Sequence, residues 1–163
     1  MSRGTSASPA RGPFAGASPG SAMRDELVLR YGSPLLLLGR VLLGGIFVLS
    51  GYGKLMGLAA FAASLEKNGV PYASVTAPIG ASVEFFGGLA VVLGIEVRYV
   101  AVLMIAFVIV ATLISHRFWE WQDAARQMQK TQFSKNVAII GGFVLLLAAG
   151  GGRLALERLW RRN

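Results

Sequence analysis

Four long apolar stretches follow one another along the chain and predict four membrane-spanning helices. They run over Leu35–Met56, Ala77–Ile95, Tyr99–Ser115 and Asn136–Gly152. Each approaches the roughly 17 to 25 residues that a helix needs to cross a bilayer. None has the polar outward face that is typical of helices in a soluble bundle, which is the alternative interpretation. The pattern therefore favours an all-α fold, a polytopic membrane four-helix bundle.

The segments that flank this bundle differ from it in composition. Residues 1–33 are rich in Ser, Gly, Ala and Pro and hold no long apolar run. We expect a disordered cytoplasmic tail there rather than a secretory signal, with Met23 as an alternative start. Residues 34–153 form the predicted four-span domain. Residues 154–163 form a basic C-terminus that we expect in the cytoplasm.

Two connecting segments on the opposite side of the membrane are more than plain linkers. In the first, Leu58, Phe61 and Leu65 recur at helical spacing, which predicts a short helix lying on the membrane surface and ended by Gly69. The second, His116–Lys135, combines aromatic residues with charges of both signs. The sequence therefore predicts two short interfacial segments on the outer side of the bundle.

The composition supports a membrane protein and predicts its orientation. The chain is 54% hydrophobic and 15% charged, with a net charge of +8. Because the charges lie between apolar stretches rather than on one polar face, a nucleic-acid binder is disfavoured. Nine basic residues lie on the side of the two termini and six on the other side. The positive-inside rule therefore predicts that both termini are cytoplasmic.

The absence of cysteine excludes several kinds of chemistry. The chain has no cysteine and one histidine, His116. This excludes disulfides, thiolate-bound metal centres, cysteine nucleophiles and bis-histidine haem. We therefore expect no metal site and no intrinsic cofactor. Any redox chemistry would need a borrowed organic cofactor or a partner subunit.

Four ionisable residues lie within or at the ends of the spans, where charge is costly and commonly functional. Arg40 and Lys54 belong to the first span, Glu84 to the second, and His116 follows the third. Because helical side chains lean toward the helix N-terminus, Lys54 is directed toward Glu84. The sequence thus predicts that Lys54, Glu84 and His116 converge near the outer side, with a Lys54–Glu84 pair favoured over Arg40–Glu84.

This convergence has two interpretations. In the functional one, Glu84 binds or exchanges a proton in a polar pocket while Lys54 and His116 orient a ligand. In the structural one, an ion pair fixes helix register and no ligand binds. Arg40 is expected to extend its side chain to the cytoplasmic headgroups, where it is also a candidate for binding an anion or a lipid. The glycines of the spans are expected to allow close helix packing.

Several short motifs, in their order and spacing from Pro34 to Gly152, resemble the DoxX family of small bacterial membrane proteins. They are Gly39-Arg40, Ser50-Gly51-Tyr52-Gly53-Lys54-Leu55, Asn68-Gly69-Val70-Pro71, Glu84-Phe85-Phe86-Gly87-Gly88-Leu89, Gly94, Arg98, His116-Arg117-Phe118-Trp119, Phe133-Ser134-Lys135-Asn136 and Gly141-Gly142. One departure is the end of the fourth span, where Gly152-Arg153-Leu154-Ala155-Leu156 lacks the acidic residue that family members often carry.

The resemblance implies a four-helix bundle in the bacterial inner membrane, and an accessory or anchoring subunit of a membrane oxidoreductase or oxidative-stress system. It carries over no catalytic residue. Two alternatives of other classes stay open: a protein that binds quinone or lipid in a polar pocket near Glu84, and a small transporter. The expected partners are the lipid bilayer and an oxidoreductase, and homo-oligomerisation stays open.

Overall fold

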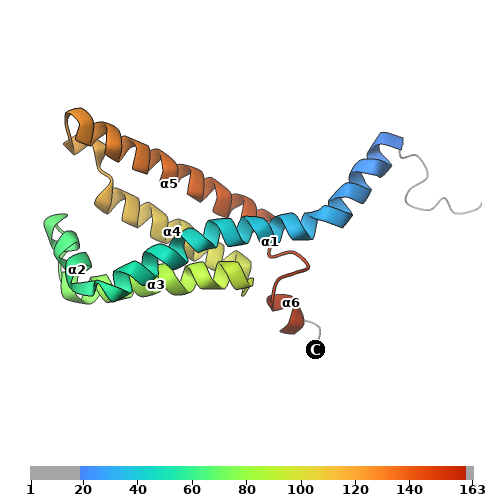
Figure 1. Ribbon diagram of the computed structural model, residues 1–163, viewed down its shortest axis with the longest axis horizontal. Helices are drawn as coiled ribbons and strands as arrows, with labels where there is room; N and C mark the ends of the chain where they lie inside the picture. The colour runs from blue at the N-terminus through green and yellow to red at the C-terminus, as the bar shows by residue number, and fades with distance from the viewer. Residues whose placement is uncertain (1–18, 161–163) are drawn as a thin grey trace, which may run out of the picture. The chain divides into compact units, whose positions relative to one another are not determined.

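The structure, a computed structural model, describes residues 19–160, with side chains from residue 30 (Figure 1). In chain order its elements are α1 (Pro19–Met56), α2 (Leu58–Lys67), α3 (Ala73–Leu93), α4 (Val97–Ser115), the single 3-10 turn η1 (Phe118–Glu120), α5 (Asp123–Ala149) and α6 (Glu157–Trp160). No strand occurs within these bounds, so the predicted all-α fold is confirmed. The chain divides into two units, Met1–Gly32 and Ser33–Asn163, and the core and the candidate site described below lie in the second.

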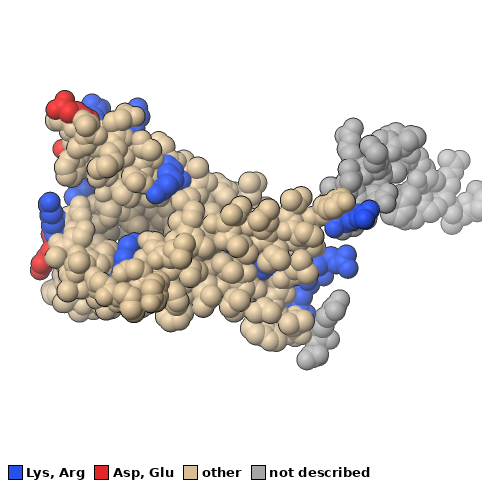
Figure 2. Space-filling model, in the orientation of Figure 1, with Lys and Arg blue, Asp and Glu red and all other residues tan. Residues whose placement is uncertain are grey.

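Four helices are long and apolar enough to cross a membrane, as predicted. They lie in Arg30–Met56, Ala73–Leu93, Val97–Glu120 and Asp123–Ala149. Large apolar side chains on their outer faces are exposed, for example Leu49 at 77% and Leu145 at 73%. Figure 2 shows a largely uncharged belt between two ends at which basic side chains gather. This distribution is the one expected when the surroundings are lipid rather than water.

All four spanning helices begin earlier than the apolar stretches predict, and the difference is largest for α1 and α5. Helix α1 begins at Pro19, so residues 19–32, where the composition predicts a disordered tail, are helical, and residues 1–18 lie outside the described part. Helix α5 begins at Asp123 rather than near Asn136. Its added turns contain good helix formers and no glycine or proline, so helix propagates into them from the apolar part. The second predicted interfacial segment is therefore reduced to η1 and the residues around it.

The short helix predicted in the first connecting segment is present as helix α2, and its place on the outer membrane surface stays a prediction. Its buried Leu65 packs against Ala73 and Ala77 of α3. The chain leaves α2 through Gly69, whose φ of 80° lies in the left-handed region that glycine adopts without strain. Helix α2 thus covers one end of α3. We name this end of the unit, formed by α2, η1 and the start of α5, the α2 end.

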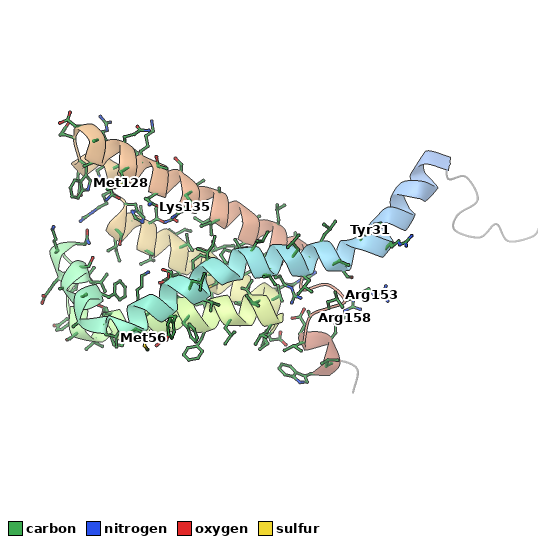
Figure 3. All side chains as sticks on the ribbon, in the orientation of Figure 1. Tyr31, Met56, Met128, Lys135, Arg153 and Arg158 are labelled. Carbon is green, nitrogen blue, oxygen red and sulfur yellow. The ribbon has the colours of Figure 1, made fainter. Side chains whose placement is uncertain are left out.

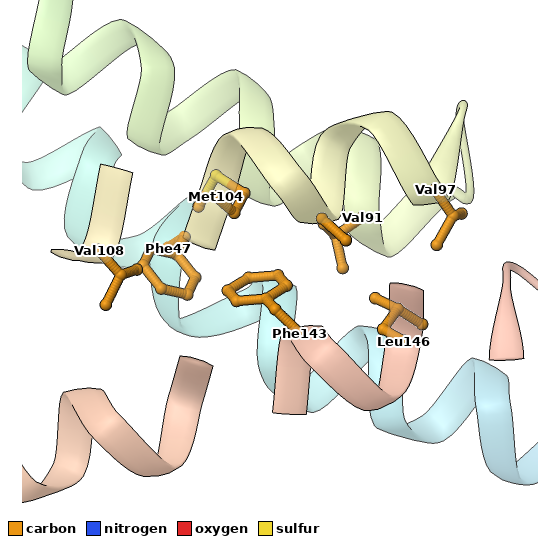
Figure 4. Packing of buried hydrophobic residues seen from close by; sticks show 8 residues of the cluster. Phe47, Val91, Val97, Met104, Val108, Phe143 and Leu146 are labelled. Carbon is orange, nitrogen blue, oxygen red and sulfur yellow. The ribbon is translucent and has the colours of Figure 1, made fainter. Parts of the chain in front are cut away.

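The core lies among α1, α3, α4 and α5 (Figure 4). Phe47 of α1 and Phe143 of α5 meet with ring centroids 5.6 Å apart, and Met104 and Val108 of α4 are buried beside them. Because lipid removes most of the hydrophobic drive between helices, this close packing is a main source of association. The core holds the four helices together beside the polar site described below.

Helices α1 and α3 approach each other closely where both carry glycine. A Cβ atom placed on Gly44 would lie 2.7 Å from the carbonyl oxygen of Gly88, and one on Gly88 would lie 2.7 Å from the Cβ of Phe47. Side chains at either position would push the helices apart. In contrast, nothing lies within 4 Å of the corresponding point on Gly45.

We predict that Gly88→Leu lowers the unfolding free energy by about 1–3 kcal/mol or more, because the added side chain meets backbone that cannot move alone. Unfolding of the purified chain by a denaturing detergent measures the change. Gly45→Leu is the matched control and should unfold like the unchanged protein. Equal stability of the two variants would contradict the close α1–α3 packing.

Candidate functional site

The ion pair between Lys54 of α1 and Glu84 of α3 is the centre of the candidate site. Glu84 lies 11 residues after the start of α3, about 16 Å along the helix, and its side chain is only 5% exposed. The side chain of Lys54 is 34% exposed. The pairing predicted from the sequence is therefore present, and Glu84 pairs with Lys54 rather than with Arg40.

A glycine brings the two partners within reach. Gly51 lies one turn before Lys54, and a Cβ atom on it would come 2.5 Å from the backbone nitrogen of Phe85, the residue after Glu84. The two helices therefore nearly touch beside the ion pair. The same motif that suggested close packing in the sequence thus also places a cation against a buried carboxylate.

Lys54, Glu84 and His116 line one cavity of about 160 Å³. It lies among α1, α3, α4 and α5, and the predicted convergence of these three residues is confirmed. Figure 2 shows the α2 end hollowed on this face, with basic side chains near the hollow. Lys135 also lines the cavity and extends from α5 toward the space between α5 and α1 (Figure 3).

Hydrogen bonds hold the polar groups on the α4 and α5 side of this cavity. His116 Nδ1 lies 2.8 Å from Gln129 Oε1. The Asn136 amide donates to the Thr112 hydroxyl at 2.8 Å, and that hydroxyl donates to the Val108 carbonyl oxygen at 2.6 Å. These bonds fix the side chains of His116 and Asn136 beside the ion pair.

Sequence reasoning missed Lys135, Asn136 and Gln129 as parts of the site. Lys135 and Asn136 were placed at the junction of a loop and a span, whereas both lie on the continuous helix α5. Helical spacing was the available signal, since Gln129 and Asn136 are seven residues apart and share one helix face. That signal was hidden because the charged residues before Asn136 favoured an interfacial loop.

Lys54 also borders a second, apolar cavity of about 240 Å³ beneath α2. Its ammonium nitrogen lies 5.1 Å from the ring centroid of Phe61, within cation–π range. The two cavities share Lys54, Phe107, Ala111 and Ser115 in their linings. Lys54 therefore stands between a polar and an apolar space.

Arg40 lies apart from this site, at the end of the unit formed by the α3–α4 turn and residues 150–160, which we name the C-terminal end. Its side chain is fully buried and donates to the carbonyl oxygen of Leu154 at 2.9 Å. The expectation that Arg40 extends to the headgroups is therefore wrong, because the returning C-terminal segment covers it. Its role as an anion or lipid ligand stays a prediction.

Backbone contacts hold that C-terminal segment in place. The Glu157 carboxylate accepts the Val97 N–H at 2.9 Å at the start of α4, and the Glu157 N–H donates to the Gly94 carbonyl oxygen at 3.0 Å. Gly94 has a φ of 77° and lies against the Arg40 guanidinium, where a Cβ atom would collide with it. Glu157 and Gly94 thus build the cover over Arg40.

The side chains that line the cavity are of types that form hydrogen bonds and can carry a proton. Within residues 30–160 no group of three or more His, Asp or Glu side chains has the spacing of a metal site. A carboxylate, an ammonium group, an imidazole and an amide converge on a space of about 160 Å³. Such a set can hold an oxygen-bearing ligand and exchange a proton with it.

We predict that Lys54→Met costs about 1–3 kcal/mol of unfolding free energy, because it leaves the Glu84 carboxylate buried without its partner. The figure is below that of a fully buried pair, since Lys54 is partly exposed. Adding Glu84→Gln to Lys54→Met should restore part of the loss, as detergent unfolding would measure. Lys67→Met, on the exposed side of α2, is the control. Strictly additive losses in the double variant would mean that the two residues are not coupled.

Comparisons with known proteins agree with this architecture. The sequence model of the family described as DoxX matches residues 35–117. The chain is 32% identical to the inner membrane protein YphA of Escherichia coli (strain K12) over 124 residues, which cover 76% of this chain and 89% of that protein. It is also 32% identical to the inner membrane protein YqjF of the same organism over 128 residues, 78% of this chain and 93% of that protein. No solved structure matches the chain. With its four membrane-length helices, the chain is an integral inner-membrane protein that belongs to the DoxX family.

Proposed function

We propose that this protein binds a ring compound with oxygen substituents, of the quinone class, that is dissolved in the membrane. The ligand would occupy the cavity lined by Lys54, Glu84 and His116. The observation that carries the proposal is a nearly buried carboxylate, paired with a lysine, that opens onto a space within the membrane region. An ion pair that served only to fix helix register would not need such a space.

The volume of the polar cavity favours a ligand with a single ring. That volume is about 160 Å³, and a cavity of about 150 Å³ in a protein core can hold benzene. An apolar cavity of that size stays dry, whereas polar groups from four helices line this one. A ligand with both a ring and polar oxygens therefore matches the space better than a plain hydrocarbon does.

The polar side chains that line the cavity favour a ligand that is recognised through its oxygen atoms. Lys54, Lys135 and the Asn136 amide can donate hydrogen bonds to a carbonyl or phenolate oxygen, and Glu84 can accept one from a hydroxyl. With two lysines against one carboxylate, the lining favours electron-rich oxygens. In this proposal Glu84 exchanges a proton with the ligand hydroxyl, and His116, held by Gln129, orients the ring.

The accessory-subunit role implied by the family resemblance is a second candidate, favoured by the C-terminal end. Arg98, Arg153 and Arg158 are exposed there beside Trp160, which is 62% exposed. A basic and aromatic surface of this kind fits lipid headgroups or an acidic face of an oxidoreductase. Since the chain has no cysteine, iron–sulfur chemistry would belong to the partner.

We predict that the full chain in detergent binds a methylated para-benzoquinone with a decyl chain, and that Glu84→Gln weakens this binding about tenfold or more. Glutamine keeps the shape of the side chain but removes the charge that pairs with Lys54 and exchanges the proton. Quenching of tryptophan fluorescence at constant detergent concentration measures the affinity.

Glu66→Gln is the matched control, because Glu66 is an exposed carboxylate on α2 that borders neither cavity. It should bind the quinone like the unchanged protein. Equal affinities of the Glu84 and Glu66 variants would exclude Glu84 from the binding site. Stronger binding of a phospholipid than of the quinone would favour the lipid alternative.

The orientation completes the proposal, with both termini in the cytoplasm and the α2 end facing outward. Because the chain has no cysteine, single cysteines can report its sidedness without background. We predict that Asn68→Cys reacts with a membrane-impermeant maleimide in spheroplasts, whereas Arg158→Cys reacts only after the membrane is broken. The reverse pattern would invert the orientation and place the ligand site at the cytoplasmic side.

A further inference from the structure

The apolar cavity beneath α2 has no role in the binding of a ring. It is walled by side chains of α2, α3 and α4, among them Phe61, Leu65, Ile79 and Val83, and by the stem of Lys54. At about 240 Å³ it is larger than the polar cavity. Ile79 and Val110, which border it, are 59% and 56% exposed on the outer faces of α3 and α4. The cavity thus lies next to the surrounding lipid.

The two cavities are neighbours rather than separate sites. Phe107, Ala111 and Ser115 of α4 line both, and Lys54 lies between them. Together they amount to about 400 Å³, which falls within the range of roughly 300–1,000 Å³ that is typical of small-molecule sites. Each cavity alone falls below that range.

We propose that the two cavities form one site for an amphiphile, whose polar ring lies beside Glu84 and whose hydrocarbon chain lies in the apolar cavity beneath α2. This inference rests on the proposed function, because the ring must occupy the polar cavity. The occupant of the apolar cavity is the ligand's own chain. Continuity with the polar cavity favours that occupant over an unattached lipid tail, because Lys54 borders both spaces.

Lys54 lies between the two parts of the site, and its contacts explain how the hydrocarbon chain of the ligand could extend past it. One face of its ammonium group meets Glu84, and the other lies over the Phe61 ring. Its side chain is the more exposed of the two partners and has a flexible stem. A chain that passes from one cavity to the other displaces the stem while the ammonium group keeps Glu84 as its partner.

Gly80 allows the apolar cavity to be filled without disturbing the backbone. It borders the cavity, and a Cβ atom on it would meet only a ring carbon of Phe61, at 3.9 Å. Gly80→Leu therefore places a side chain in the space proposed for the hydrocarbon chain. Val83→Phe fills the same cavity from the next turn of α3 and serves if the first variant does not fold.

The experiment compares two probes on the full chain in detergent: a methylated para-benzoquinone with a decyl chain, and the same ring with methyl in place of decyl. We expect Gly80→Leu to weaken binding of the decyl compound about tenfold or more, because the decyl group can no longer enter the apolar cavity. Binding of the methyl compound should be unchanged. Gly45→Leu, which borders neither cavity, should bind both probes like the unchanged protein.

Each other outcome overturns the inference. If Gly80→Leu and Val83→Phe bind the decyl compound like the unchanged protein, the decyl chain of the ligand does not occupy the apolar cavity. If they weaken both probes equally, the two cavities do not divide the ligand as proposed. If the unchanged protein binds neither probe, the proposed function itself fails, and the inference fails with it.

Discussion

A carboxylate within the membrane-spanning part of a protein needs a partner, and the arrangement at the α2 end depends on how Glu84 meets that need. Its partner is Lys54, on a different helix. The pair forms only if α1 and α3 approach closely, which Gly51 permits beside it and Gly44 and Gly88 permit further along. Small residues and a buried charge thus act together, since the glycines bring the helices together and the ion pair favours one register.

The same pair explains why a polar cavity persists among apolar helices. Replacing Lys54 and Glu84 by apolar residues of similar size would often be neutral or stabilising, so stability alone does not require them. Three further polar groups reach the cavity from the other two helices: His116 beside α4, and Lys135 and Asn136 on α5. Hydrogen bonds to Gln129 and Thr112 position two of these groups, His116 and Asn136. This convergence of polar groups is the reason why we propose a bound ligand there, in place of an ion pair that only fixes the register of α1 and α3.

Much of the fold could be predicted because hydropathy reports directly on lipid contact, and the Lys54–Glu84 pair followed from helix geometry and side-chain direction. The predicted start of the fourth span was wrong because the polar residues before Asn136 belong to the same helix, α5. Several side chains between Asp123 and Lys135 are charged, which indicates that this segment lies in water or among headgroups. Charge alone does not end a helix, however, and the segment contains no glycine or proline that would end it. Arg40 misled for the opposite reason. Its cover, Leu154 to Glu157, is distant in sequence, and no local pattern predicts that return.

The two cations of the first span, Arg40 and Lys54, have different surroundings. Arg40 is fully buried, donates to the carbonyl oxygen of Leu154, and borders an apolar cavity of about 590 Å³ between α1 and α5. Lys54 has a carboxylate partner, an aromatic ring and two adjoining cavities, and it stays partly exposed. The bond of Arg40 to Leu154 links α1 to the returning C-terminal segment. Because Lys54 borders both a polar and an apolar cavity, the α2 end is where we propose that a membrane-dissolved molecule binds.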